Sequence, residues 1–562
     1  MTERCIWIVC FIPLDATGTK FFGFSEFLAG LALLVLVWTL ADIRYKFRIQ
    51  TAPLPLQTIT FWVVLTIGIL TLLTDLWRTE GWLVPKGNLL TPGTWQGLLG
   101  AALLLTFLAW AWFAFIDPPR YGVRNAKRFA NALYSSMVKS APEELGVIAD
   151  ELARSTRTLV RLAPEREKLK AAAKSEPKSR REVAAAYAND ILLLIADKRF
   201  CRVIVRSAPG TAWALFSEVQ EAKKYRAPIA TFGANIVRAA IENKDSFLFH
   251  EGDGYASGLL GYQKPLSQAI FSNFELVEAA GTLLDPEPGD PGDWDEDQWQ
   301  AYCRVVCLTF RSFVVGGFHH SHSFSLYRAF SQIERACGDL YKLNGQGERW
   351  EHELLARVYV VVKFIQEAIK ILDQKPIPSA AKARMGRRQG GQSFYDYLAR
   401  LIFELIHSAS AVRAPYDICW HVQHNSVWSS LFHLNGLDTP AGKLVKAKVR
   451  RLLYEEIVEM EQFPNFKGAK ILGLCLNVLG LQLGASPLDP HDGALQRVVL
   501  AWTKRNYVRL HAANSVVAAE CLVDRITYEA DGPRLVNTYP VENLRTEARR
   551  VVLELDRPAE RQ

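Results

Sequence analysis

Residues 21–43 read FFGFSEFLAGLALLVLVWTLADI, and two more apolar stretches follow: LQTITFWVVLTIGILTLLT at 56–74 and GLLGAALLLTFLAWAWFAFI at 97–116. Each stretch approaches the ~20 residues that a helix needs to cross a bilayer. Residues 27–41 carry no charge, and the third stretch ends at Asp117, just before a proline pair that stops a helix. Soluble core helices rarely run this long without a charge, so the sequence predicts three transmembrane helices.

Side chains within and beside these stretches fit a bilayer. The second stretch contains five threonines. A threonine hydroxyl can bond to a backbone carbonyl one turn back, so it costs little in lipid. Trp77, Trp82 and Trp95 flank the stretches, as is typical of aromatic rings at a membrane interface. Residues 1–20 contain too short an apolar run for a signal peptide, and we expect them to form an extracytoplasmic N-terminus.

Basic residues in the connecting loops predict the orientation. The loop after the first stretch contains Arg44, Lys46 and Arg48. The second loop has two basic residues offset by two acids, whereas four basic residues follow the third stretch between positions 120 and 128. Loops rich in lysine and arginine stay in the cytoplasm. We therefore expect a multi-pass protein of the plasma membrane, with its N-terminus outside and everything after Asp117 in the cytoplasm.

The 562 residues leave room for two to four domains after the membrane, at ~100–200 residues each. Composition shifts and clusters of proline, glycine and charge indicate where the parts meet. The predicted parts are the N-terminus 1–20, a transmembrane domain 21–117, a juxtamembrane helical and charged linker 118–182, a first cytoplasmic helical lobe 183–284, an acidic loop 285–299, a second cytoplasmic helical lobe 300–556, and a tail 557–562.

Apolar residues recur at helical spacing through the second lobe. The clearest stripes lie in 353–372, 394–406 and 443–460, where each helix buries one face. Two further helices are expected at 467–483 and 494–528. The predicted fold class is therefore mostly α: three N-terminal transmembrane helices followed by a large cytoplasmic α-helical domain. The segment CRVIVR at 201–206 fits a strand or a helix end equally well.

The net charge of +8 is modest for this length, and much of it lies beside the predicted spans. There it favours anionic lipid, at ~1 kcal/mol for each basic residue near the surface. A basic run of five residues precedes four glutamates on one helix, which indicates a solvated helix with internal ion pairs, so we expect no nucleic-acid partner. The run comprises Lys443, Lys446, Lys448, Arg450 and Arg451. Nine scattered cysteines form no disulfide pattern. All but Cys5 and Cys10 fall in the predicted cytoplasmic part, and an odd, unpatterned set is what a reducing compartment allows.

Two histidine clusters are the best chemical candidates. One contains His319, His320 and His322, and the other contains Cys419, His421 and His424. Zinc sites use three or four ligands of these types, but neither cluster matches a zinc-binding spacing. We expect packed or surface histidines and assign no metal ligand, cofactor or catalytic residue, while leaving metal binding at either cluster as an open alternative.

Two predicted loops could have either a functional or a purely structural role. Residues 245–277 place glycines among aromatic and charged side chains, which fits either a binding loop or a packed irregular connection. We favour the connection. In the acidic loop, Asp293, Asp295 and Asp297 alternate as in an EF-hand. The glycine and glutamate that a calcium loop requires further along are missing, so no calcium site is assigned.

These features predict a membrane-tethered interaction or sensing protein without enzymatic activity. An oligomeric ion channel gated by the cytoplasmic domain is the first alternative, with the threonines of the second span lining the pore. A membrane-anchored enzyme is the second, with the glycine-rich segment or a histidine cluster as its site. The expected partners are the lipid bilayer and, as alternatives left open, a second copy of the chain or a protein on the cytoplasmic side.

Overall fold

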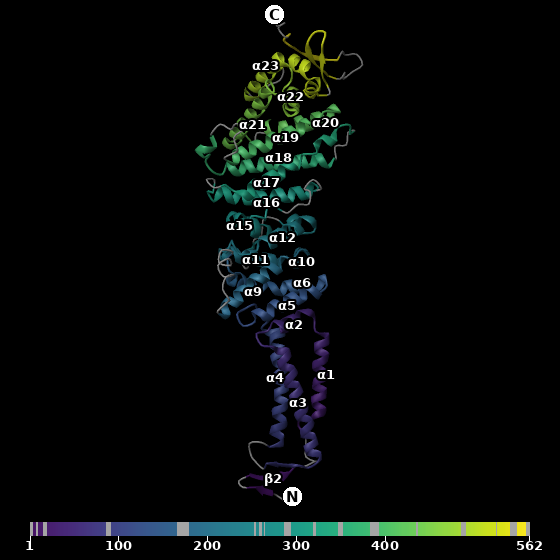
Figure 1. Ribbon diagram of the computed structural model, residues 1–562, viewed down its shortest axis with the longest axis vertical. Coiled ribbons are helices and arrows are strands. Elements are labelled where there is room, and N and C mark those ends of the chain that lie inside the picture. The colour runs from purple at the N-terminus through teal and green to yellow at the C-terminus, as the bar shows by residue number, and fades with distance from the viewer. Residues whose placement is uncertain are drawn as a thin grey trace. The chain divides into compact units, whose positions relative to one another are not determined.

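The structure is a computed structural model of the whole chain (Figure 1). It is mostly helical, as the sequence predicts, with three small antiparallel sheets in its described part. The residues that the structure describes are 4–6, 9–14, 20–85, 91–165, 179–251, 255–257, 261–263, 265–285, 294–318, 322–346, 352–382, 393–433, 437–484, 490–523, 525–539 and 548–557.

The chain forms two compact units, Met1–Ala239 and Ala240–Gln562. Each unit has its own helices. The predicted lobe boundary at 285–299 falls largely on residues 286–293, which lie outside the described residues, and that boundary stays a prediction.

Three helices of the first unit form an apolar bundle: α1 (Phe24–Leu40), α3 (Leu56–Thr79) and α4 (Pro92–Ala111). In Figure 1 they run side by side. A π-helix, η1 (Trp112–Ile116), continues α4. By length and composition α3 and the α4–η1 helix could each span a membrane.

The first predicted span differs from the structure at its end. α1 stops at Leu40, and α2 (Ile43–Thr51) begins after a bend of 106°. The Asp42 side chain accepts a hydrogen bond from the backbone N–H of Arg44, so it caps a new helix in a different direction. The pair α1 and α2 counts as a third candidate span only if the two helices are taken as one broken segment.

Two clusters of buried side chains hold the apolar bundle together. At one end Phe27, Ile67 and Leu99 pack together. Gly68 permits this contact, because a Cβ there would lie 2.8 Å from the Phe27 ring. At the other end Trp110 packs with residues of α2, α3 and η1. Elsewhere the helices expose their apolar side chains, and in the most apolar windows of α3 and α4 only 22% and 17% of the residues are buried.

A small sheet closes one end of the bundle. Strand β2 (Val9–Pro13) pairs with β1 (Arg4–Ile6) on one side and with β3 (Leu83–Pro85) on the other. Because β3 lies in the loop between α3 and α4, the N-terminal strands and this loop are at the same end. The sheet was not predicted, because its strands are too short to show periodicity.

The described elements in the rest of the first unit are helices. CRVIVR lies within α10, so the helical alternative for this segment is the correct one. The remaining helices are α5 (Ala126–Lys139), α6 (Pro142–Ala153), α7 (Thr156–Leu162), α9 (Arg180–Leu194), α10 (Lys198–Ser207), α11 (Pro209–Glu221) and α12 (Ala230–Glu242), which crosses into the second unit.

The second unit begins with short elements and continues with long helices that pack against one another. The short elements are α13 (Phe247–His250), β4 (Tyr255–Ser257), β5 (Gly261–Gln263), α14 (Leu266–Phe271) and α15 (Phe274–Ala280). The others are α16 (Glu296–Val315), α17 (Phe324–Arg335), η3 (Leu340–Leu343), α18 (Glu353–Leu372), η4 (Ser379–Lys382), α19 (Phe394–Ser410), α20 (Tyr416–Trp420), η5 (His421–His433), α21 (Pro440–Glu459), α22 (Phe466–Leu479), α23 (Pro490–Ala513) and α24 (Ser515–Glu520).

The helix predicted at 494–528 is wrong beyond Ala513. α23 ends at Ala513, and Asn514 caps the separate helix α24 by accepting from the N–H of Val517. The chain then forms an antiparallel sheet of β6 (Ile526–Glu529), β7 (Arg534–Thr538) and β8 (Arg550–Glu554). Its β-branched and aromatic residues favour strands, and a helical period cannot be told from a strand over so few residues.

Candidate functional site

A buried ion pair joins α2 to α6. Arg48 and Glu151 are 6% and 7% exposed, and they meet in a two-pronged contact. The Arg48 Nε donates to Glu151 Oε2 at 2.9 Å, and Nη2 donates to Oε1 at 2.6 Å. The remaining guanidinium nitrogen, Nη1, donates to the backbone carbonyl of Ala114 in η1 at 2.6 Å. We call this three-way contact of α2, α6 and η1 the Arg48 junction.

The C-terminal end of α2 is held from a second side by α5 and the residue before it. Asn125 Nδ2 donates to the Thr51 carbonyl at 2.7 Å. Arg128 Nη1 donates to the carbonyls of Ala52 and Pro53 at 3.0 and 2.6 Å. Carbonyls at a helix end lack partners within their own helix, so these side chains replace water there. α2 therefore cannot shift without breaking polar contacts to α5, α6 or η1.

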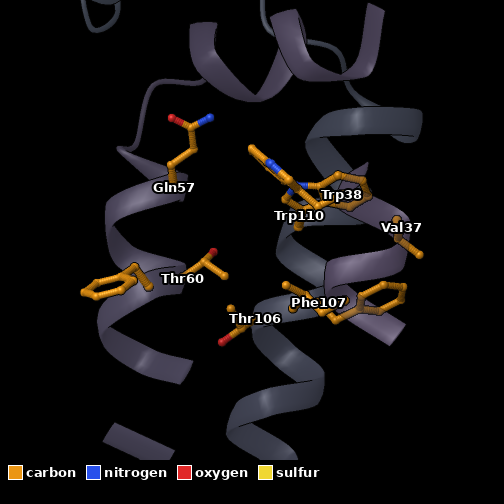
Figure 2. Close-up of a pocket in the computed structure, with 9 residues that line it drawn as sticks. Val37, Trp38, Gln57, Thr60, Thr106, Phe107 and Trp110 are labelled. Carbon is orange, nitrogen blue, oxygen red and sulfur yellow. The ribbon is translucent and has the colours of Figure 1, made fainter. Parts of the chain in front are cut away.

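The end of the bundle nearest α2 contains a pocket of about 400 Å³. Each of the three bundle helices contributes to its wall, and Figure 2 shows the side chains around it. The lining residues are Leu34, Val37 and Trp38 of α1, Gln57, Thr60 and Phe61 of α3, and Thr106, Phe107 and Trp110 of α4. The volume lies within the ~300–1,000 Å³ typical of small-molecule sites, and the lining is mostly apolar.

Five lining side chains carry polar atoms: those of Trp38, Gln57, Thr60, Thr106 and Trp110. Trp110 is buried, and its indole Nε1 has no hydrogen-bond partner among the described residues. The Thr106 hydroxyl donates to the Ala102 carbonyl at 2.8 Å, which leaves its oxygen as an acceptor. In Figure 2, Gln57 and Thr60 lie on one side of the pocket, with Trp38, Phe107 and Trp110 on the other.

Sequence reasoning missed the pocket and misjudged Arg48. The sequence presents Arg48 as a basic loop residue that reports orientation, and no local pattern shows that it is buried against Glu151, 103 positions away. The available signal was its place within a short amphipathic segment, 43–51. Polar residues at helical spacing within apolar stretches, such as Gln57 and Thr60, were a second signal.

The first histidine cluster lies mainly outside the described residues, since only His322 among its three histidines is described. His322 lines a narrow cavity of about 70 Å³ beside Phe394 and Tyr395. Metal binding by His319 and His320 therefore stays an open alternative.

In the second cluster each side chain has a different surrounding. Cys419 is buried and accepts a hydrogen bond from Asn477 Nδ2, with 3.7 Å between nitrogen and sulfur. The His424 ring stacks on Trp420, with 4.1 Å between ring centres. Burial lowers the pKa of His421. Within the described part of the chain, no group of three histidine, cysteine or acidic side chains is placed to hold a metal ion.

The basic run of α21 is solvated only in part: Arg451 is exposed and pairs with Glu455 one turn later, as the sequence indicates, but two lysines are not solvated. Lys446 and Lys448 are buried. Lys448 Nζ donates to Asp396 at 2.7 Å, and Lys446 Nζ donates to Asp438 at 2.9 Å, which lowers the pKa of that carboxyl group. These two cations act inside the second unit, because buried charges persist in proteins when they are paired.

The next cation of that run, Arg450, reaches a fully buried acid that the sequence did not single out. Arg450 Nε donates to Asp492 Oδ1 at 2.8 Å, and His433 Nε2 lies 3.1 Å from Asp492 Oδ2. This trio ties together η5, α21 and α23. We read it as structural, because Asp492 has both oxygens occupied.

The acidic and glycine-rich loops also show structural contacts where they are described. Burial opposes ionisation of Asp295, but hydrogen bonds from Lys244 and from the N–H of Gln298 outweigh it and lower the pKa of the acid. The Lys244 Nζ lies 2.6 Å from Asp295 and 3.1 Å from Asp297. In the glycine-rich segment, Glu251 accepts the N–H groups of two residues at the start of α14. Asp293 and residues 252–254 and 258–260 lie outside the described residues.

Comparison of the sequence with models of known protein families and with curated proteins finds no match. The function is therefore inferred from the pocket and from the Arg48 junction.

Proposed function

We propose that this protein is a membrane-tethered sensing protein without enzymatic activity. In this proposal α1, α3 and α4 cross the bilayer, and the chain after Asp117 lies in the cytoplasm. α2 lies at the inner surface and passes changes in the spacing or tilt of the three helices to α5 and α6.

The arrangement of the first unit supports three crossings. The sheet β1–β2–β3 places the N-terminal strands and the α3–α4 loop at one end of the bundle. α2 and the exit of η1 meet at the other end, through the Arg48 contact with Ala114. A chain that enters the bundle at the sheet end and leaves it at the α2 end crosses the bundle an odd number of times, and three helices are present. The basic residues gather at the α2 end, which is the end expected inside the cell.

The Arg48 junction is the observation that carries the proposal. It links one guanidinium to a bundle helix through η1 and to the following domain through Glu151. A buried, two-pronged arginine–carboxylate pair fixes orientation as well as distance. π-helical turns such as η1 often occur at functional positions. A displacement of α4 therefore reaches α6 through two hydrogen-bonded contacts, that of Ala114 with Arg48 and that of Arg48 with Glu151.

The channel alternative receives less support from α3. The hydroxyls of Thr66, Thr71 and Thr74 each donate to a carbonyl one turn earlier in their own helix. Thr71 is buried inside the bundle. These threonines therefore do not present a row of free hydroxyls to an ion path between copies, and we prefer sensing.

Hydrogen exchange of the full chain in lipid nanodiscs tests the coupling. The protein is placed in phosphatidylcholine with shorter or longer acyl chains, and exchange is followed in residues 126–153. We expect exchange in α5 and α6 to differ between the two lipids. In the double variant Arg48→Met/Glu151→Met, which replaces the pair by apolar side chains and can leave stability unchanged, this difference should vanish.

Lys46→Met is the matched control, because it removes a cation from the same helix without touching Glu151. It should respond to lipid as the parent protein does. Equal responses in the parent and in the double variant, or no response in the parent, would contradict the proposal.

A further inference from the structure

We propose that Cys5 and Cys10 form a disulfide bond that closes the N-terminal hairpin on the outer side of the membrane. The proposal adds a covalent site to the proposed sensing protein. It rests on that proposed function in one respect, the extracytoplasmic placement of the N-terminus.

The register of β1 against β2 places the two cysteines opposite each other. Cys5 pairs with Cys10, in the middle of the three residue pairs that join these strands. Directly opposite residues of an antiparallel pair share one face of the sheet, with their Cα atoms about 4.5 or 5.5 Å apart. Disulfide bonds join cysteines whose Cα atoms lie roughly 4.4–6.8 Å apart. Either spacing therefore permits the bond without movement of the backbone.

The distribution of cysteines along the chain points to the same pair. The seven other cysteines lie between positions 201 and 521, where they are free thiols, and six of them are buried. All seven follow Asp117, in the part proposed to lie in the cytoplasm, where thiols stay reduced. Cys5 and Cys10 precede the first span. The two cysteines proposed to reach an oxidising space are therefore the two that the sheet places together.

The bond would hold together the sheet at the outer end of the bundle. β1 has three residues, and a hairpin of this length is at best marginally stable in water by itself. The other edge of β2 pairs with β3, and the backbone N–H of Leu14 donates to the Trp82 carbonyl at 3.2 Å. Covalent closure keeps β1 paired with β2, and through β2 it keeps the N-terminus on the α3–α4 loop.

The bond forms by exchange with an extracytoplasmic thiol oxidoreductase that carries a disulfide. One cysteine thiolate attacks that disulfide and forms a mixed disulfide with the donor. The second cysteine thiolate then attacks the sulfur of the first, which forms the bond between Cys5 and Cys10 and releases the donor as a dithiol. Two electrons pass from the cysteines to the donor, and the two thiol protons end on the sulfurs of the donor.

Mass spectrometry of a single tryptic peptide tests the proposal. Trypsin cleaves after Arg4 and Lys20, so both cysteines lie on the peptide 5–20. The full chain is made in cells, quenched in acid to stop exchange, and alkylated with N-ethylmaleimide in denaturant before digestion. We expect a peptide without maleimide that is lighter by two hydrogens than the dithiol. After reduction the same peptide should take up two alkyl groups.

Cys475, a buried free thiol of α22, is the internal control, because it should carry maleimide in the same digest. The variant Cys5→Ser leaves Cys10 without its partner, so Cys10 should then take up one maleimide. A membrane-impermeant maleimide added to intact cells should label Cys10 in this variant and neither cysteine in the parent protein. This second measurement locates the N-terminus whether or not the bond forms.

Two maleimides on the peptide 5–20 of the parent protein would overturn the proposal. A bond from either cysteine to a second copy of the chain, seen as a covalent dimer on a non-reducing gel, would overturn it as well. If the parent peptide carries two maleimides and Cys10 of Cys5→Ser is labelled in intact cells, the disulfide alone is rejected. If Cys10 is also unlabelled in intact cells, the outer placement of the N-terminus is rejected with it.

Discussion

Arg48 illustrates how a charge can lie inside a protein next to an apolar bundle. All three of its outer nitrogens have an acceptor, two on Glu151 and one on Ala114. Desolvation of an arginine and a glutamate is costly, and their attraction offsets it only when the geometry is good and the other hydrogen bonds are made. The junction meets both conditions. Removing Glu151 leaves Arg48 buried without its carboxylate, whereas removing Arg48 leaves Glu151 with Arg44 alone, whose Nε lies 3.6 Å from Glu151 Oε1.

Glu151→Ala should therefore lower the free energy of unfolding by about 3–5 kcal/mol, because it leaves Arg48 without its carboxylate. Chemical denaturation of the full chain in detergent, followed by circular dichroism, measures this loss. Glu143→Ala is the control, since Glu143 is exposed on the same helix and should change stability by less than about 0.5 kcal/mol. Equal effects of the two substitutions would show that the junction does not stabilise the fold.

Single residues were the hardest part to predict from the sequence. Arg48 and Lys448 look like solvent-facing cations, because hydropathy describes a residue by its type and not by its distant partner. Their partners, Glu151 and Asp396, lie 103 and 52 positions away. Burial of such pairs follows from tertiary contacts that no local pattern contains.

At the scale of helices and strands, the elements predicted correctly from the sequence are those that hydropathy and helical periodicity determine. α3 and α4 follow from long uncharged runs, and α18 and α19 follow from apolar stripes at helical spacing. The turn from α1 into α2 depends on the cap at Asp42, and the sheet of β6 to β8 depends on pairing between separate segments. Capping and pairing are decided by a few atoms, so periodicity did not reveal them.

A substitution at Gly68 tests whether the bundle requires close packing of α1 against α3. A Cβ at this position would lie 2.8 Å from the Phe27 ring, which is shorter than real contacts allow. Gly68→Ala should destabilise the bundle by about 1–3 kcal/mol, the usual cost of overpacking. Thermal unfolding in detergent measures the change.

The matched control for Gly68 is Gly93→Ala in the first turn of α4. An added Cβ there meets nothing closer than 4.0 Å. Alanine is also a better helix former than glycine, so this variant should be neutral or slightly more stable. If Gly68→Ala proves equally harmless, close packing of α1 against α3 is not what holds this end of the bundle.

At the scale of the whole molecule, the sequence predicts a mostly helical chain with apolar helices near its N-terminus, and the structure confirms this much. The pocket could not have been predicted, because it arises where three helices separated by loops fail to fill the space between them. The proposed sensing function has two structural requirements. The bundle must lie in lipid, and the Arg48 junction must connect it to the helices that follow.

Placement of the two ends of the bundle on opposite sides of the membrane is the central claim, and cysteine labelling in intact cells tests it most directly. Single cysteines are introduced as Glu80→Cys, at the β3 end, and as Glu143→Cys, in α6, in a chain that carries Cys5→Ser and Cys10→Ser. A membrane-impermeant maleimide should label the protein with Glu80→Cys in intact cells, and the protein with Glu143→Cys only after the cells are permeabilised. Labelling of the Glu143→Cys protein in intact cells, to the same extent as the Glu80→Cys protein, would contradict the account.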